Sequence, residues 1–210
     1  MINIKDVTLV CVACVRVNKA INAINYSIKG INFDSIKLIT NEDVESKNFE
    51  IIKINKLNYD EYNRFIIFDL YKYISTKYAL IIQDDGFIVN PESWMDDFLN
   101  YDYIGAPWPI NHSIFSDKNN NLIRVGNGGF SLRSNKLLSI ASEKKLNWDN
   151  TNEDVFICVK NRHIYEECGI KFAPIDVAKY FSHEFNLLET SGINPFGFHS
   201  SRQNYYNLIK

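Results

Sequence analysis

The sequence predicts an α/β fold, with one domain built around a mixed, mostly parallel central sheet. In the first half, short β-rich runs alternate with segments of helical periodicity, which is typical of parallel strands joined by helices. The 210 residues, 46% of them apolar, are enough for one sizeable core. No internal repeat, low-complexity tract or Pro/Gly/Ser-rich linker marks a second domain, so residues 1–210 are expected to form one unit.

Four runs in the first half are expected to be strands: residues 7–15, 35–40, 49–54 and 78–83. Between the first two, apolar residues recur at helical spacing from Val17 to Ile28, and Gly30 follows where a helix would end. A second helix is expected to begin at Asn58, because its side chain can cap the helix while Glu61 completes a capping box.

The second half reads as shorter helices and turns. Asn90 and Pro91 are typical of a helix start, which predicts a third helix from Pro91 to Asn100. The polar stretch that follows, up to Asn121, is a candidate lid. The remaining expected elements are a tight turn entering a strand over residues 126–133, a helix over 135–144, a helix after Asn152, and an aromatic flap over 194–199 that returns to the sheet edge.

Composition and charge exclude some classes of function. The 23 Lys and Arg residues are interspersed among 25 Asp and Glu, so no basic field favours nucleic-acid binding. No run approaches the ~20 apolar residues of a membrane span. The first residues lack the charged-then-apolar layout of a signal peptide, so the chain is expected to be cytoplasmic.

The four cysteines predict buried thiols in a reducing compartment. Cys11 and Cys14 form a C-x-x-C, but they lie in an apolar run that reads as a strand. Cys158 and Cys168 are separated by nine residues, which does not complete a zinc knuckle. Zinc is therefore the weaker interpretation.

Two acidic pairs and one histidine are the sharpest chemical signals. Asp84 and Asp85 end an apolar strand, where ligands bind in open parallel sheets, and adjacent carboxylates can hold a hard divalent cation. The alternative for this pair is a solvated turn. Glu153 and Asp154 offer a general base or cap a helix. His199 offers an imidazole ligand or is a packed side chain.

Three further features have both a functional and a structural interpretation. The glycines of residues 126–129 let backbone approach a ligand, but the spacing is neither a dinucleotide fingerprint nor a P-loop. Arg64 can meet a phosphate or extend from the surface. Trp108, between two prolines, can stack on a sugar ring or lie in the core.

Six blocks in order resemble a small glycosyltransferase family of bacteria and viruses, long catalogued as a domain of unknown function. They are residues 62–65 (YNRF), 80–87 (LIIQDDGF), 101–108 (YDYIGAPW), 126–133 (GNGGFSLR), 153–158 (EDVFIC) and 196–199 (FGFH). The first sixty residues match only as a nucleotide-binding βαβ pattern. The resemblance implies a GT-A fold, with residues 1–85 as the nucleotide-binding half and 86–210 as the acceptor and catalytic half.

The resemblance also implies Mn²⁺ or Mg²⁺, a nucleotide-sugar donor (UDP favoured) and a glycan acceptor. Gln83-Asp84-Asp85 departs from the D-x-D of GT-A enzymes and is closer to the small family's Gln-any-Asp-Gly. The roles carried over are metal binding by Asp85 and His199, catalysis by the Glu153–Asp154 pair with Asp154 as base, donor binding by Gln83, Asp84, Arg64, Asn127 and Gly128, and acceptor stacking by Trp108. Topology alone adds Cys14, Arg16 and Thr40 to the donor site.

These residues predict inverting transfer, and three alternatives stay open. The first is a retaining transferase on the same fold. The second is a metal-dependent hydrolase or nucleotidyltransferase, and the third is a non-catalytic carbohydrate- or nucleotide-binding relative. Donor sugar, acceptor and linkage depend on a few pocket contacts that the sequence does not display. A lipid-linked acceptor would bring the enzyme to the inner membrane leaflet.

Overall fold

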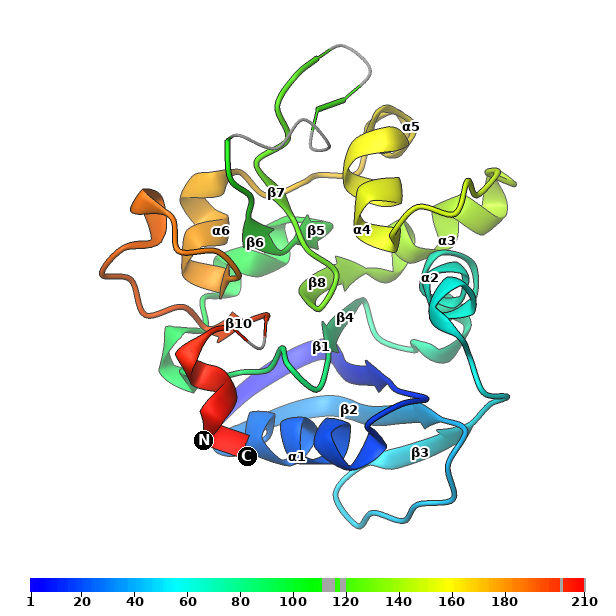
Figure 1. Ribbon diagram of the computed structural model, residues 1–210, viewed down its shortest axis with the longest axis vertical. Coiled ribbons are helices and arrows are strands. Elements are labelled where there is room, and N and C mark those ends of the chain that lie inside the picture. The colour runs from blue at the N-terminus through cyan, green and yellow to red at the C-terminus, as the bar shows by residue number, and fades with distance from the viewer. Residues whose placement is uncertain (111–115, 118–119, 201, 210) are drawn as a thin grey trace.

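The computed structural model (Figure 1) describes residues 1–110, 116–117, 120–200 and 202–209. The strands are β1 (Ile2–Val12), β2 (Ile31–Thr40), β3 (Glu50–Lys53), β4 (Tyr78–Ile82), β5 (Tyr103–Ile104), β6 (Ala106–Pro107), β7 (Val125–Gly126), β8 (Phe130–Ser134), β9 (Ser182–His183) and β10 (Gly197–Phe198). The α-helices are α1 (Val17–Ser27), α2 (Tyr59–Phe68), α3 (Asn135–Glu143), α4 (Glu153–Val155), α5 (Arg162–Glu167) and α6 (Ile175–Phe181). The 3₁₀ helices are Leu70–Tyr73, Pro91–Ser93, Asp96–Asn100, Leu188–Thr190 and Asn204–Ile209, and Phe156–Lys160 is a π-helical turn.

A six-stranded sheet in the order β3-β2-β1-β4-β8-β5 forms the centre of the structure. β1 pairs in parallel with β2 and β4, and β2 pairs in parallel with β3. β8 is antiparallel to both of its neighbours, β4 and β5. The sheet is therefore mixed and mostly parallel, which confirms the predicted fold class.

Each face of the sheet is covered by its own apolar core. β1 and β4 alternate between the two faces, because successive side chains of a strand point in opposite directions. Leu9 and Leu80 pack on the face covered by α1 and α6, and Val10 and Ile81 pack on the face covered by α2, α3 and the segment after α4. In Figure 1, α2 to α5 lie on the right of the view, and α6 and the C-terminal segment lie on the left.

Both helices expected in the first half are present. The predicted capping box at the start of α2 is also confirmed: the Asn58 side chain accepts from the Glu61 N–H at 2.9 Å, and Glu61 accepts from the Asn58 N–H at 2.8 Å. Gly30 has φ +78°, as a helix stop requires. Because these signals are local, they identified the elements without tertiary information. The helices expected over residues 135–144 and after Asn152 also form, as α3 and α4.

The prediction of one helix from Pro91 to Asn100 is wrong. Two short 3₁₀ helices stand there, separated by extended backbone at Trp94. The Asn90 side chain does not cap the first of them; it donates to the Pro195 carbonyl at 2.7 Å. The Trp94 indole packs on Phe196, with ring centroids 5.1 Å apart. Tertiary contacts with the C-terminal segment thus override the local helix signal.

The segment over residues 194–199 folds back onto the residues that follow β4. β10 pairs with β9, and Gly197 forms a bridge with Ile88. The segment over residues 194–199 therefore docks beside the end of β4 rather than at the sheet edge.

The last described helix, Asn204–Ile209, is held against α1, because Lys19 of α1 donates to the Tyr206 hydroxyl at 3.0 Å.

Three further expectations concern the rest of the chain. Cys11, Cys14 and Cys158 are buried free thiols, and Cys168 is a partly exposed one. The lid expected up to Asn121 lies partly outside the described residues. Within the described ranges, no helix has the length and apolar character needed to cross a membrane.

Candidate active site

The chain makes a tight turn directly after β4, and this turn presents the first acidic pair. The Gln83 N–H donates to the Gly86 carbonyl at 2.9 Å, and the Gly86 N–H donates back to the Gln83 carbonyl at 3.1 Å. Asp84 pairs with the Arg16 guanidinium at 3.1 Å, and its Oδ2 is buried without a hydrogen-bond partner. Burial raises the pKa of Asp84, and Arg16 partly offsets that effect. The pair is therefore not simply a solvated turn.

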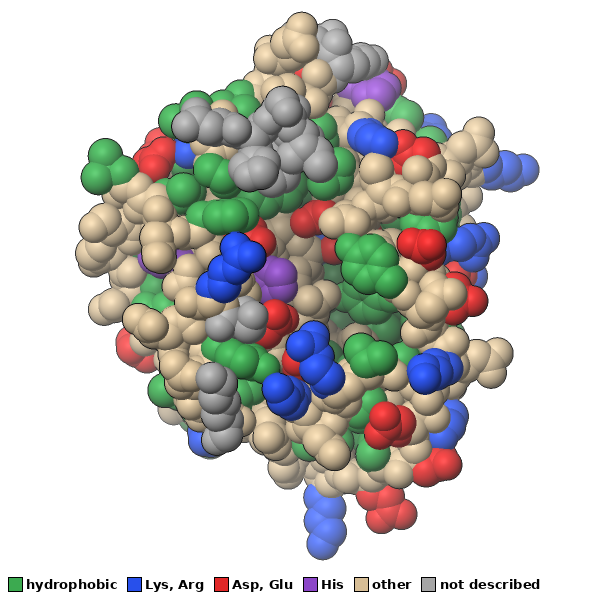
Figure 2. Space-filling model, in the orientation of Figure 1, with side chains coloured by type: hydrophobic (Ala, Val, Ile, Leu, Met, Phe, Trp, Pro, Cys, Tyr) green, Lys and Arg blue, Asp and Glu red, His purple; other side chains and the backbone are tan. Residues whose placement is uncertain are grey.

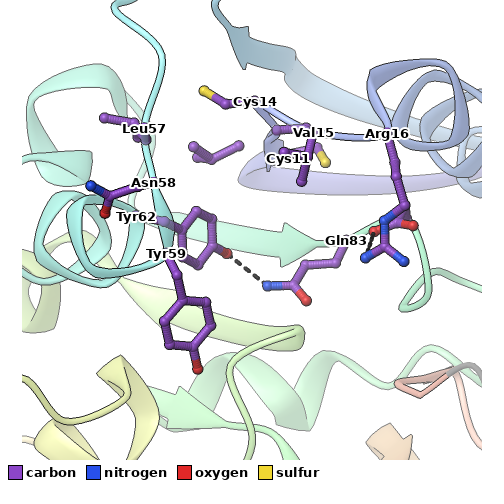
Figure 3. A pocket seen from close by; sticks show the side chains of 12 residues that line it. Cys11, Cys14, Val15, Arg16, Leu57, Asn58, Tyr59, Tyr62 and Gln83 are labelled. Carbon is purple, nitrogen blue, oxygen red and sulfur yellow. Dashed lines mark hydrogen bonds and ion pairs between the residues drawn. The ribbon is translucent and has the colours of Figure 1, made fainter.

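A cavity of about 320 Å³ opens beside this turn, between the end of β1, the start of α2 and the end of β4. Figure 3 shows Cys14, Arg16 and Gln83, three of the residues expected to bind the donor, on its walls, together with Tyr59 and Tyr62 from α2. The Gln83 amide donates to the Tyr62 hydroxyl at 2.7 Å. The two tyrosines were missed by the sequence analysis, although their place in the first turn of a capped helix was the available signal.

His199 lies between carboxylates from two different segments. Its Nε2 is 3.5 Å from Asp85 Oδ1, and its Nδ1 is 3.6 Å from Glu184 Oε1. Burial alone would lower the pKa of His199, but the two carboxylates outweigh burial and raise the pKa to about 9. Glu184 was also missed, because no motif surrounds this one acid. Figure 2 shows that this face is hollowed near its centre, where acidic, basic and histidine side chains gather.

Asp85 and His199 are the residues that fit a divalent cation. They provide a carboxylate oxygen and an imidazole nitrogen, a donor set that suits Mn²⁺, and the unpartnered Oδ2 of Asp84 belongs to the same turn. Among the residues that the structure describes, no group of three or more His, Cys, Asp or Glu is arranged to hold a metal ion. A cation held by these two side chains alone would keep coordination positions for water and substrate phosphates.

The glycine-rich turn packs closely against the protein's own side chains. Asn127 accepts at Oδ1 from the N–H groups of Gly129 and Phe130, at 2.8 and 3.2 Å, and its Nδ2 lies 2.9 Å from His199 Nδ1. A Cβ at Gly129 would stand 2.2 Å from the His199 imidazole. A Cβ at Gly128 would stand 1.5 Å from the Glu153 carboxylate. Asn127 and Gly128, expected to line the sugar pocket, are therefore supports for His199 and Glu153.

The two members of the second acidic pair have different surroundings. Glu153 is buried and pairs with the buried Arg133 at 2.6 Å, so it is held as part of the structure and is not available as a base. Asp154 is half-buried and accepts from the Val155 N–H at 2.7 Å. Burial and the neighbouring charge of Glu153 raise the pKa of Asp154 to about 7. A carboxylate that titrates near neutral pH is suited to general-base chemistry.

Three residues predicted to bind substrate lie elsewhere. Arg64 is exposed on α2, 3.8 Å from Asp69 and with its guanidinium 5.6 Å from the Phe68 ring centre, and it does not line the cavity. Trp108 is 2% exposed because its indole fills the space above Gly126, so it offers no stacking face to an acceptor. Thr40 ends β2 but is fully buried, and its hydroxyl accepts from the backbone two residues on.

Replacing Gly128 by Ala is expected to destabilise the fold by about 1–3 kcal/mol, because the added methyl overlaps the Glu153 carboxylate. The φ of Gly128 is not in the left-handed region, so this cost is steric. Urea unfolding of Gly128→Ala in the wild-type and Glu153→Ala backgrounds measures it. The penalty should shrink once Glu153 is truncated; an equal penalty in both backgrounds would contradict the overlap.

The fold is similar to that of known sugar-transferring enzymes. A structure of the galactosyltransferase LgtC with donor and acceptor sugar analogues superposes with a TM-score of 0.58 at 10% identity, covering 92% of this chain and 87% of that one. An active-site mutant of LgtC gives 0.55 at 10% identity, with coverages of 93% and 88%. The bifunctional IspDF from Campylobacter jejuni gives 0.49 at 11% identity, with coverages of 80% and 48%. The similarity to LgtC confirms the GT-A fold.

No curated protein matches the sequence. One family model, described as a protein of unknown function (DUF5672), matches residues 43–199. That segment contains β4, the turn with Asp84 and Asp85, Asp154 and His199. The chain therefore belongs to the DUF5672 family.

Proposed function

We propose that this protein is a metal-dependent glycosyltransferase. It would move a sugar from a nucleoside-diphosphate donor, with UDP favoured by the resemblance of its sequence blocks, to a hydroxyl of a glycan acceptor, with inversion at the anomeric carbon. The fold similarity to the galactosyltransferase LgtC supports the class of reaction. The observation that carries the proposal is the contact of Asp85 with His199 next to the cavity between β1, α2 and β4.

The donor would lie along the carboxyl edge of the sheet. The cavity, with Gln83 and Tyr62 on its walls, would receive the nucleoside. The Arg16 side chain is about half exposed, and its guanidinium pairs with Asp84. It is therefore placed to contact a phosphate, the role that the sequence suggested for Arg64. Asp85 and His199 would hold Mn²⁺ or Mg²⁺. When bound, such a cation neutralises charge on a departing diphosphate.

The acceptor would be activated by Asp154. A carboxylate with a pKa of about 7 is largely ionised at slightly alkaline pH and can still take a proton from a hydroxyl in the transition state. Glu153 cannot share this work, because Arg133 holds its carboxylate in the interior. The charge of Glu184, which lies beside His199, also raises the pKa of Asp154, and this supports placing the proposed base near the proposed metal ligands.

Calorimetric titration tests the donor half of the proposal. UDP and a panel of UDP- and GDP-sugars are titrated into the protein with and without Mn²⁺, and the donor that binds is then incubated with glycan acceptors. We expect one nucleotide to bind only with the metal and its sugar to be transferred. Proton NMR of the product reads the anomeric configuration. A protein that binds no nucleotide in the presence of Mn²⁺ would contradict the proposal and favour a sugar-binding module.

A further inference from the structure

A buried polar chain connects the first turn of α4 with His199. It runs through Glu153, Arg133, Tyr103 and Asn127, which we call the buried frame. Arg133 Nη1 lies 2.6 Å from Glu153 Oε2, and both side chains are almost fully enclosed. Burial opposes the charge of Arg133, but Glu153, with smaller contributions from neighbouring groups, raises the pKa of the guanidinium, which therefore keeps its charge.

The rest of the buried frame continues to the other side of the site. The Arg133 guanidinium stands 5.0 Å from the centre of the Tyr103 ring. The Tyr103 hydroxyl donates to the Asn127 carbonyl at 2.7 Å. The Asn127 side chain in turn lies 2.9 Å from His199 Nδ1. An unbroken series of contacts thus joins the turn that carries Asp154 to the histidine beside Asp85.

The glycine-rich turn adds a second connection between the same two places. Gly128 lies against the Glu153 carboxylate, and Gly129 lies against the His199 imidazole. The backbone between them fixes how far apart these two side chains stand. On the opposite side, the Glu153 N–H donates to the Asn63 side chain at 2.9 Å, which ties the start of α4 to α2.

Stability alone does not explain this ion pair. Removing two charges from water costs several kcal/mol per ion, and replacing a buried pair by apolar side chains of similar volume is often neutral or stabilising. The carboxylate that Arg133 holds belongs to the residue directly before Asp154.

We propose that Arg133 is a positioning residue for the transfer reaction: through Glu153 it fixes the first turn of α4 and the direction of the Asp154 carboxylate. This inference rests on the proposed function. Arg133 itself touches no substrate, because its side chain is 0% exposed. Among the charged groups around Asp154, Glu153 raises the pKa of that carboxyl more than Arg133 lowers it.

The test replaces the pair by apolar side chains, in the double variant Arg133→Met/Glu153→Met. We expect an unfolding midpoint near that of the wild type and unchanged Mn²⁺-dependent donor binding. We expect kcat to fall about 100-fold, the size of effect that a small misplacement of a catalytic group causes. The ascending limb of the pH–rate profile should also move below pH 7, because the variant removes both groups and Glu153 raises the pKa of Asp154 more than Arg133 lowers it. The matched control, Arg162→Met/Glu166→Met, removes an ion pair of the same residue types on α5 and should keep the wild-type kcat and profile.

Each outcome decides one question. A folded double variant with the wild-type kcat and pH profile would overturn the positioning role and leave the proposed function intact. If the double variant does not fold, Arg133→Lys takes its place: it keeps the charge but loses the fork that fits a carboxylate. A folded Arg133→Lys with wild-type kcat at every pH would overturn the role equally. Wild-type protein that transfers no sugar from any donor would overturn the proposed function, and the positioning role with it.

Discussion

Replacing Asp154 by Asn is expected to lower kcat by about 10²–10⁴-fold, the contribution typical of a positioned general base. The amide keeps the shape of the carboxylate but cannot accept the acceptor's proton. Donor affinity in the presence of Mn²⁺ should stay within a few-fold, because Asp154 does not line the nucleotide cavity. Steady-state kinetics and calorimetry on the same preparation separate the two effects. Asp176→Asn, at a side chain that is 86% exposed, is the control.

The pH dependence of the wild type follows from the same residue. The base must be deprotonated to act, so the rate should rise with pH through about 7 and level off above it.

The free energy of unfolding should change with pH in the opposite sense. The folded-state pKa is raised above the ordinary value, so the folded protein binds the extra proton and loses this contribution as pH rises through about 7. Asp154→Asn should therefore be more stable than the wild type at pH 8. If Asp154→Asn turned over the donor at the wild-type rate, the assignment of Asp154 as the base would be contradicted.

Replacing Asp85 by Ala is expected to remove the dependence of nucleotide binding on Mn²⁺. Loss of a second-shell partner typically costs 10–100-fold in metal affinity, so loss of a direct ligand should cost more than about 100-fold. His199→Ala should show the same loss, since the two side chains face each other at 3.5 Å. Mn²⁺ binding is followed by electron paramagnetic resonance, which needs no turnover. Asp43→Ala, at a side chain that is 97% exposed, is the control. Wild-type Mn²⁺ affinity in both site variants would place the metal elsewhere.

The elements that local patterns specify could be predicted, and they also place much of the site. α1 and α2 follow from helical periodicity and from the capping box at Asn58. β4 is five buried apolar residues, and its end necessarily puts Asp84 and Asp85 at the carboxyl edge of a parallel sheet. The order of strands around β1 then brings Cys14 and Arg16 to the same cavity. These inferences need only the periodicity of a strand or helix and the rule that ligands bind at the carboxyl ends of the strands in an open α/β sheet.

The remaining assignments depend on partners that are distant in sequence. Glu153 and Asp154 are adjacent and chemically alike, and only the position of Arg133, twenty residues earlier, makes one structural and leaves the other accessible. Trp108 has the sequence context of an exposed turn, but Gly126 leaves room for its indole in the core. Glu184 reaches His199 because β9 and β10 pair. Side-chain environments of this kind are set by packing, which local patterns do not encode.

The way the C-terminal segment docks beside the end of β4 has a consequence for synthesis on the ribosome. All six strands of the central sheet precede residue 135, so the sheet can assemble while the rest of the chain is still being made. Asp85 is then already in place, but its partner His199 emerges more than a hundred residues after it. The strand pairings of the sheet can therefore form before the two proposed metal ligands meet. Competence for the proposed reaction arises in a separate, late event, when the segment that carries β10 closes onto the finished sheet.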